Sequence, residues 1–90
     1  MEKEFVIEAV DSLRMEITLA DHLDGNMIPP EFTDSRWKLR TAAILLDGDY
    51  SGVRLDLENV DEAERLYYEV LEEWKPIRER FKEHYRFWLI

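Results

Sequence analysis

The chain has 90 residues and a formal net charge of −9, from 21 acidic and 12 basic side chains, and 46% of its residues are hydrophobic. It contains no cysteine, which excludes disulfide bonds, thiolate metal sites and cysteine nucleophiles. The apolar content suffices for a folded core, the acidic charge disfavours nucleic-acid partners, and no apolar run reaches the ~20 residues that cross a membrane.

Residues 1–20 carry two competing apolar patterns. Leu13, Met15, Ile17 and Leu19 alternate with polar or charged residues, which predicts half-buried strands. A helix is the alternative, because another set of apolar residues falls on one helical face: Val6, Val10, Leu13, Ile17 and Ala20. The β-branched side chains of Ile17 and Thr18 favour strands, and we therefore predict strands over 1–20.

Residues 21–35 are predicted to form an irregular loop, since they contain Asp-Gly-Asn, Pro-Pro and Thr-Asp-Ser sequences that interrupt regular structure. Residues 36–58 follow as a predicted β-hairpin. Apolar residues alternate from Trp37 to Leu45 and again from Val53 to Leu57, and an acidic, glycine-containing segment joins the two runs.

Residues 59–89 are predicted to form one long helix. Apolar or aromatic residues recur every three or four positions, with His84 as the exception: Val60, Ala63, Tyr67, Val70, Trp74, Ile77, Phe81, His84 and Trp88. Asn59 and Glu62 have the spacing of a capping box at the helix start. Pro76 removes one helical amide, but the apolar stripe keeps its phase, so we expect a kink there.

The expected fold is α+β: a single domain over residues 1–90, with a small antiparallel sheet of two hairpins packed by one kinked C-terminal helix. Such a helix is about 40 Å long, whereas a strand of six or seven residues covers about 20 Å. The part of the helix beyond Pro76 should therefore fold back or meet a second chain, and we favour the second chain. We expect this interface to comprise Trp74, Ile77, Phe81, Tyr85 and Trp88, and a homodimer to be its simplest form.

Residues 47–58 resemble the twelve-residue calcium loop of EF-hand proteins. The resemblance implies a set of oxygen ligands from Asp47, Asp49, Ser51 and Glu58, with Gly52 at the turn and a carbonyl ligand from Val53. Tyr50 and Arg54 depart from the pattern. A hairpin loop that is rich in acid and glycine is the favoured alternative, so no metal or other cofactor is expected.

No motif in the chain identifies a reaction, because neither histidine has a metal-ligand spacing and no serine lies in a nucleophile motif. We therefore predict a non-enzymatic protein-interaction module that associates with itself or another protein. The alternative is an acidic inhibitor or nucleic-acid mimic, whose strongest patch would be Glu62, Glu69, Glu72 and Glu73. The acid-rich N-terminus is unlike a signal peptide, so we expect a cytoplasmic protein.

Overall fold

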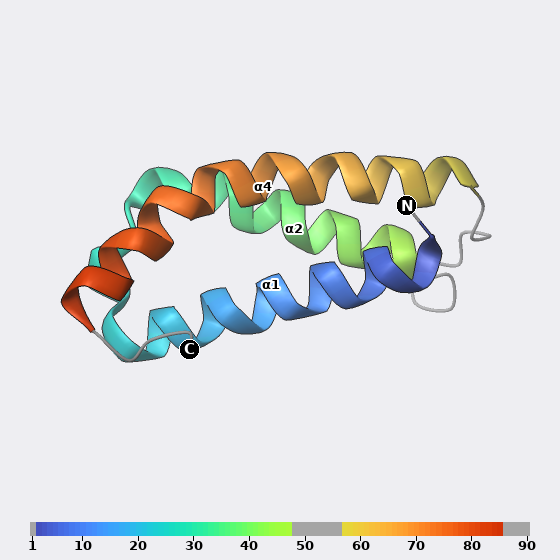
Figure 1. The fold of residues 1–90 in the computed structure, drawn as a ribbon. Helices are drawn as coiled ribbons and strands as arrows, with labels where there is room; N and C mark the ends of the chain where they lie inside the picture. Colours follow the sequence, from blue (N-terminus) through green and yellow to red (C-terminus); the bar gives the residue numbers. More distant parts are fainter. Residues whose placement is uncertain (1, 48–56, 86–90) are drawn as a thin grey trace.

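The computed structural model describes residues 2–47 and 57–85, and within them it is helical throughout its regular structure. Helix α1 spans Lys3–Asp24, α2 spans Thr33–Leu46 and α4 spans Leu57–His84. Figure 1 shows α1 and α2 running in opposite directions, with α4 lying along both of them. The described residues contain no strand, so the predicted α+β fold with a four-stranded sheet is wrong.

Helix α1 replaces the strands that the sequence predicts over residues 1–20. Its buried side chains are those of the alternative helical pattern: Val6, Val10, Leu13, Ile17 and Ala20. Met15 and Leu19 lie on another face of the same helix and are exposed. The alternation that predicts a strand therefore comes from two apolar faces of one helix, and the burial of one face overrides the β-preference of Ile17.

The predicted irregular loop over residues 21–35 is shorter than expected. Helix α1 continues to Asp24, two short 3₁₀ turns follow at Gly25–Met27 and Pro30–Phe32, and α2 starts at Thr33. The amide of Ile28 donates to the carbonyl of Gly25, and that of Phe32 donates to the carbonyl of Pro29. Ile28 and Phe32 are buried, so this turn closes one end of the core.

The hairpin predicted over residues 36–58 is also wrong where the structure describes it. Helix α2 occupies its first part and buries side chains at helical spacing: Ser35, Leu39, Ala42 and Leu46. The amide of Asp47 donates to the carbonyl of Ile44 as α2 ends. Residues 48–56, which would hold most of the predicted second strand, lie outside the described residues.

The long C-terminal helix is confirmed as α4, which begins two residues before the predicted cap at Asn59. Pro76 lies inside α4, and Figure 1 shows the helix continuing past it while its axis bends towards the end of α1. Most of the predicted stripe is buried, together with Leu66: Val60, Ala63, Val70, Trp74, Ile77 and Phe81. His84, the polar exception in this stripe, is exposed.

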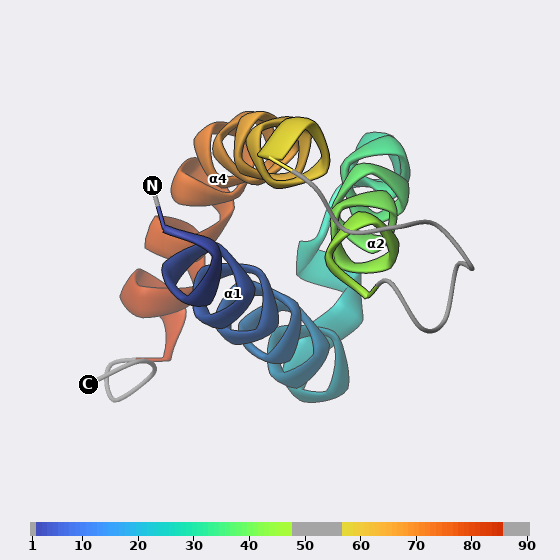
Figure 2. The ribbon, with the colours of Figure 1, turned by 90° about the vertical axis from the view of Figure 1, so that its right-hand side faces the viewer.

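The core runs along the axis enclosed by the three helices, which Figure 2 shows end-on. The molecule measures 42 × 24 × 19 Å, so α4 alone spans nearly its full length, at about 1.5 Å per residue. Trp74 is fully buried in the core, and its ring centroid lies 5.4 Å from that of Phe32 and 6.2 Å from that of Phe81. These rings join α4 to the turn between α1 and α2.

Candidate functional site

The predicted interface residues lie mostly inside the molecule. Trp74, Ile77 and Phe81 are buried in the core of a single chain. Tyr85 is half-buried, its ring centroid lies 6.1 Å from that of Phe81, and its hydroxyl donates to Asp24 over 3.1 Å. Trp88 lies outside the described residues. Helix α1 and the following turn therefore cover the part of α4 beyond Pro76 that we expected a second chain to cover.

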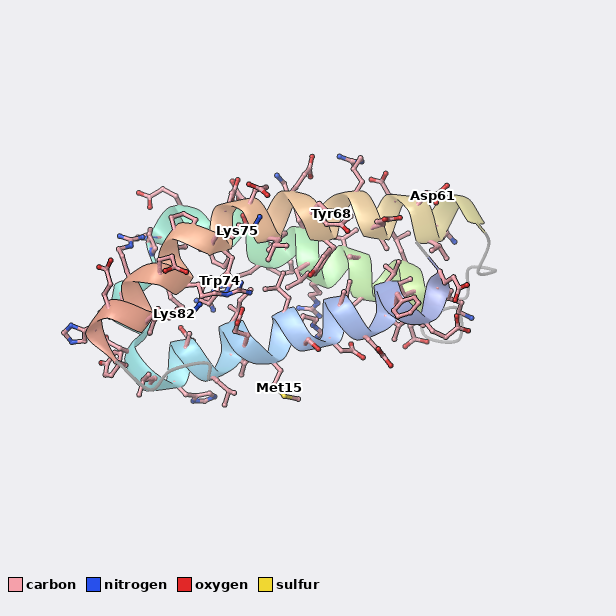
Figure 3. The ribbon with its side chains drawn as sticks, in the orientation of Figure 1. Met15, Asp61, Tyr68, Trp74, Lys75 and Lys82 are labelled. Carbon is pink, nitrogen blue, oxygen red and sulfur yellow. The ribbon has the colours of Figure 1, made fainter. Side chains whose placement is uncertain are left out.

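A buried polar cluster fixes α4 against α1. The carboxylate oxygen Oε2 of Glu16 accepts from the Trp74 indole nitrogen at 2.5 Å and from Nη2 of Arg78 at 2.8 Å. The side chain of Glu16 is only 14% exposed and that of Arg78 27%. Figure 3 shows Trp74 pointing from α4 into the space towards α1. Glu16, Trp74 and Arg78 are thus bonded to one another, which makes the cluster a structural clamp between the two helices.

The acidic front of α4 does not form a patch of a single charge. Arg65 pairs with both Glu62 and Glu69, and Lys75 pairs with Glu72 at 2.9 Å. The hydrogen bond from Arg65 lowers the pKa of Glu62, so this carboxylate stays ionised while its charge is offset. Glu73 accepts a hydrogen bond from the buried hydroxyl of Ser35. All four acids of the predicted patch thus have partners within the chain.

The predicted calcium loop falls largely outside the described residues. Asp47 follows α2 and is exposed, whereas Asp49 and Ser51 lie in residues 48–56. Glu58 belongs to the first turn of α4, and its side chain is outside the described part. A helix therefore stands on each side of this segment. Among the described residues, no group of three or more His, Cys, Asp or Glu side chains is arranged to hold a metal ion.

A groove of about 650 Å³ runs between α1 and α2 and opens to solvent. Its apolar floor is built from both helices and includes buried and half-buried side chains: Ile7, Val10, Ile17, Leu39, Ala43, Ile44 and Leu46. From Ile7 to Thr18 the groove follows α1 for about 16 Å, or three helical turns. A volume of this size lies within the range of protein binding sites.

Charged side chains line the groove in an ordered way. Arg36 and Arg40 on α2 and Arg14 on α1 line the part nearer the turn that joins the two helices. Asp11 and Asp47 line the opposite part, near the start of α1 and the end of α2. The pairing of Arg36 with Asp21 at 3.1 Å establishes this register between the antiparallel helices.

Two of these arginines have no carboxylate partner within the described part of the chain. Arg36 binds Asp21, whereas the guanidinium of Arg40 lies 5.4 Å from the ring centroid of Trp37 and that of Arg14 makes no ion pair there. In a chain with a net charge of −9, unpaired arginines beside an apolar groove are an unusual feature. They give the groove a locally basic end.

A second apolar surface lies on the outward face of α1. Four large side chains on this face are between 41% and 66% exposed: Phe5, Met15, Leu19 and Leu23. They recur at helical spacing over about five turns, and we refer to them as the α1 stripe. Figure 3 shows Met15 pointing away from the other two helices. The sequence contained the signal for this face, because these residues lie outside the buried pattern of α1.

No protein family, no curated protein and no solved structure shows significant similarity to this chain. None of the helices in the described ranges combines the length and the apolar composition needed to span a bilayer.

Proposed function

We propose that this chain is a non-enzymatic protein-interaction module whose α1–α2 groove receives an amphipathic helix of a partner protein. The observation that carries the proposal is the groove itself, a trough between two antiparallel helices whose lining is apolar and polar in about equal parts, with arginines along its edge. A helix that inserts one apolar face into such a trough completes a four-helix arrangement and covers the half-buried floor residues Ile7, Ala43 and Ile44. Three turns of groove match apolar anchors at positions i, i+4 and i+7 of the incoming helix.

The charge around the groove supports a protein partner of opposite sign. Arg14 and Arg40 offer guanidinium groups that pair well with carboxylates, and their planar shape favours two hydrogen bonds at once. The acid-inhibitor alternative receives less support, because the four acids on the front of α4 are already paired within the chain. We also propose the cytoplasm as its compartment, since a chain without cysteine gains no disulfides in an oxidising one.

The groove can be tested by NMR titration with a designed amphipathic helical peptide that carries leucine anchors. We expect amide shifts at Val10, Leu39 and Ala43 and their loss in Ala43→Phe, where the added ring fills the groove floor. Thr41→Phe adds the same ring to the outer face of α2 and should leave binding intact. Shifts that are absent, or that survive Ala43→Phe, would remove the groove as the site.

Self-association is the second candidate, and the α1 stripe favours it, with a second copy of the chain as the occupant. In an antiparallel pairing of two α1 helices about Ser12, the acidic start of one helix lies beside the Leu19–Leu23 end of the other. This arrangement separates Glu4 and Glu8 from their copies and places Glu4 near His22 of the second chain. A parallel pairing would bring like charges together.

Sedimentation measures this self-association directly. We expect a dimer that persists at about 0.5 M salt, because apolar contact is little affected by screening. Leu19→Glu should yield a monomer with unchanged helix content. Trp37→Glu removes an equally exposed apolar side chain from α2 and should leave the dimer unchanged. A wild-type chain that is monomeric at high micromolar concentration would refute self-association through this face.

A further inference from the structure

We infer that the α1–α2 groove selects the direction of the helix it binds: the acidic half of the partner helix is its N-terminal half, and the helix runs parallel to α2. This inference rests on the proposed function, since it assigns the chemistry and the orientation of the occupant of the same groove. It follows from the order of charges along the groove together with the dipole of an α-helix.

The order of charges is set by the antiparallel packing of α1 and α2. Arg36, near the start of α2, pairs with Asp21, near the end of α1. Arg40 lies one turn further along α2, and Arg14 lies two turns back from Asp21 along α1. Both therefore occupy the part of the groove that extends from the interhelical turn to its middle. This part carries three arginines among its lining residues.

The far part of the groove has the opposite sign. Asp11 lies one turn before Arg14, and Asp47 directly follows the last residue of α2. A docked helix would thus meet arginines at one end and aspartates at the other. Like charges placed together across an interface are disfavoured, so a helix with acidic and basic halves binds more tightly in one direction than in the other.

The helix dipole then determines which end is which. Stable amphipathic helices carry acids in their first turns and bases in their last turns, because the helix ends have partial charges of opposite sign. Helix α4 itself follows this rule, with acids before Trp74 and bases after it. A partner helix of this kind places its N-terminal half over Arg36, Arg40 and Arg14, and its C-terminal half near Asp11 and Asp47. Its direction is then that of α2.

Two designed peptides of equal composition and equal leucine anchors provide the test. One peptide carries glutamates in its first half and lysines in its second, and the other has the two halves exchanged. We expect the glutamate-first peptide to bind about tenfold more tightly, as exposed ion pairs of ordinary strength to Arg14, Arg40 and Asp11 would give. The combined variant Arg14→Glu and Arg40→Glu should abolish this preference, whereas Arg80→Glu, an exposed change on α4, should preserve it.

The two peptides can differ in intrinsic helicity, which would itself change their affinities. We therefore compare the affinity of each peptide for the parent chain with its affinity for the arginine variant, because the helicity of the peptide is the same in both measurements. A nitroxide at the N-terminus of the glutamate-first peptide should broaden the amide signals of Thr18 and Arg36 more strongly than those of Asp11 and Leu46. Equal affinities, a preference that survives the arginine variants, or stronger broadening at Leu46 than at Arg36 would overturn the inference while the groove remains a binding site. Failure of both peptides to perturb the groove would instead overturn the proposed function.

Discussion

Removal of the Glu16 carboxylate should destabilise the fold more than removal of any exposed acid on α1. In Glu16→Ala the indole N–H of Trp74, whose residue is fully buried, loses its acceptor. An unsatisfied buried donor costs about 1–3 kcal/mol. Arg78 also loses its counterion, and breaking a fully buried ion pair costs about 3–5 kcal/mol. Because 27% of the Arg78 side chain is exposed, water compensates part of this loss, and we expect about 3 kcal/mol in total.

Urea denaturation followed by far-ultraviolet circular dichroism would measure this loss in the free energy of unfolding. Glu8→Ala is the matched control, because Glu8 is an exposed acid on the same helix, and its removal should cost under about 0.5 kcal/mol. Glu16→Gln retains a carbonyl that can accept from Trp74, so it should cost about half as much as Glu16→Ala. In a double-mutant cycle with Arg78→Ala, the coupling should be about 1–2 kcal/mol. Equal stability of Glu16→Ala and Glu8→Ala would refute the reasoning.

Three further outcomes are expected. Phe81→Ala removes a ring that is fully buried beside Trp74, so urea melts should show a loss of about 3–5 kcal/mol, and unchanged cooperative unfolding would contradict its place in the core. Calcium at millimolar concentration should not raise the melting temperature; a rise of several degrees that disappears in Glu58→Gln would support the EF-hand resemblance. Partial burial raises the pKa of Tyr67, so its contribution to stability is complete below the pKa of the unfolded phenol, about 10, and is lost as pH rises through the folded value. Melts between neutral and alkaline pH should therefore show a smaller decline in Tyr67→Phe than in the parent chain, and identical declines would contradict this assignment.

The sequence predicts α4 well because the helix has one continuous apolar face. Its stripe repeats over seven turns with the period of a helix, and no other regular structure produces that pattern. Pro76 does not interrupt the stripe, and the structure accordingly keeps the helix continuous there. The sequence is less informative about the role of the aromatic residues. The apolar stripe predicts that Trp74 and Phe81 are buried, but not whether the residues that bury them belong to the same chain.

The expected interface at the end of α4 depended on the predicted sheet, which is too short to cover that helix. Helix α1 has 22 residues and, with the following turn, reaches the region beyond Pro76. Asp24 binds the hydroxyl of Tyr85, and Phe32 contacts Trp74. One wrong element assignment therefore placed Trp74, Ile77 and Phe81 at an interface, although all three are buried within a single chain.

The sequence does not predict the groove between α1 and α2, because its two sides are formed by separate helices. Arg14 and Arg40 are 26 positions apart, and only the antiparallel packing of α1 and α2 brings them to one trough. Within its own helix each arginine is an ordinary exposed base. Their significance depends on the tertiary register that the pair between Asp21 and Arg36 reveals.

The incorrect strand prediction over residues 1–20 has a physical cause, which is a second apolar face on α1. Leu13 and Ile17 belong to the buried face of α1, while Met15 and Leu19 belong to the exposed stripe, and the two sets interleave into an alternation that imitates a strand. A surface helix that only supports a core would carry polar residues at positions 15 and 19, and its helical pattern would then be unambiguous. The ambiguity is thus a direct consequence of a second apolar face.

Met15→Lys combined with Leu19→Glu should leave the buried face and the free energy of unfolding of the chain nearly unchanged, within about 0.5 kcal/mol in urea melts, while it removes self-association. A large loss of stability in the monomeric variant would show that the stripe supports the fold of a single chain and is not an interface.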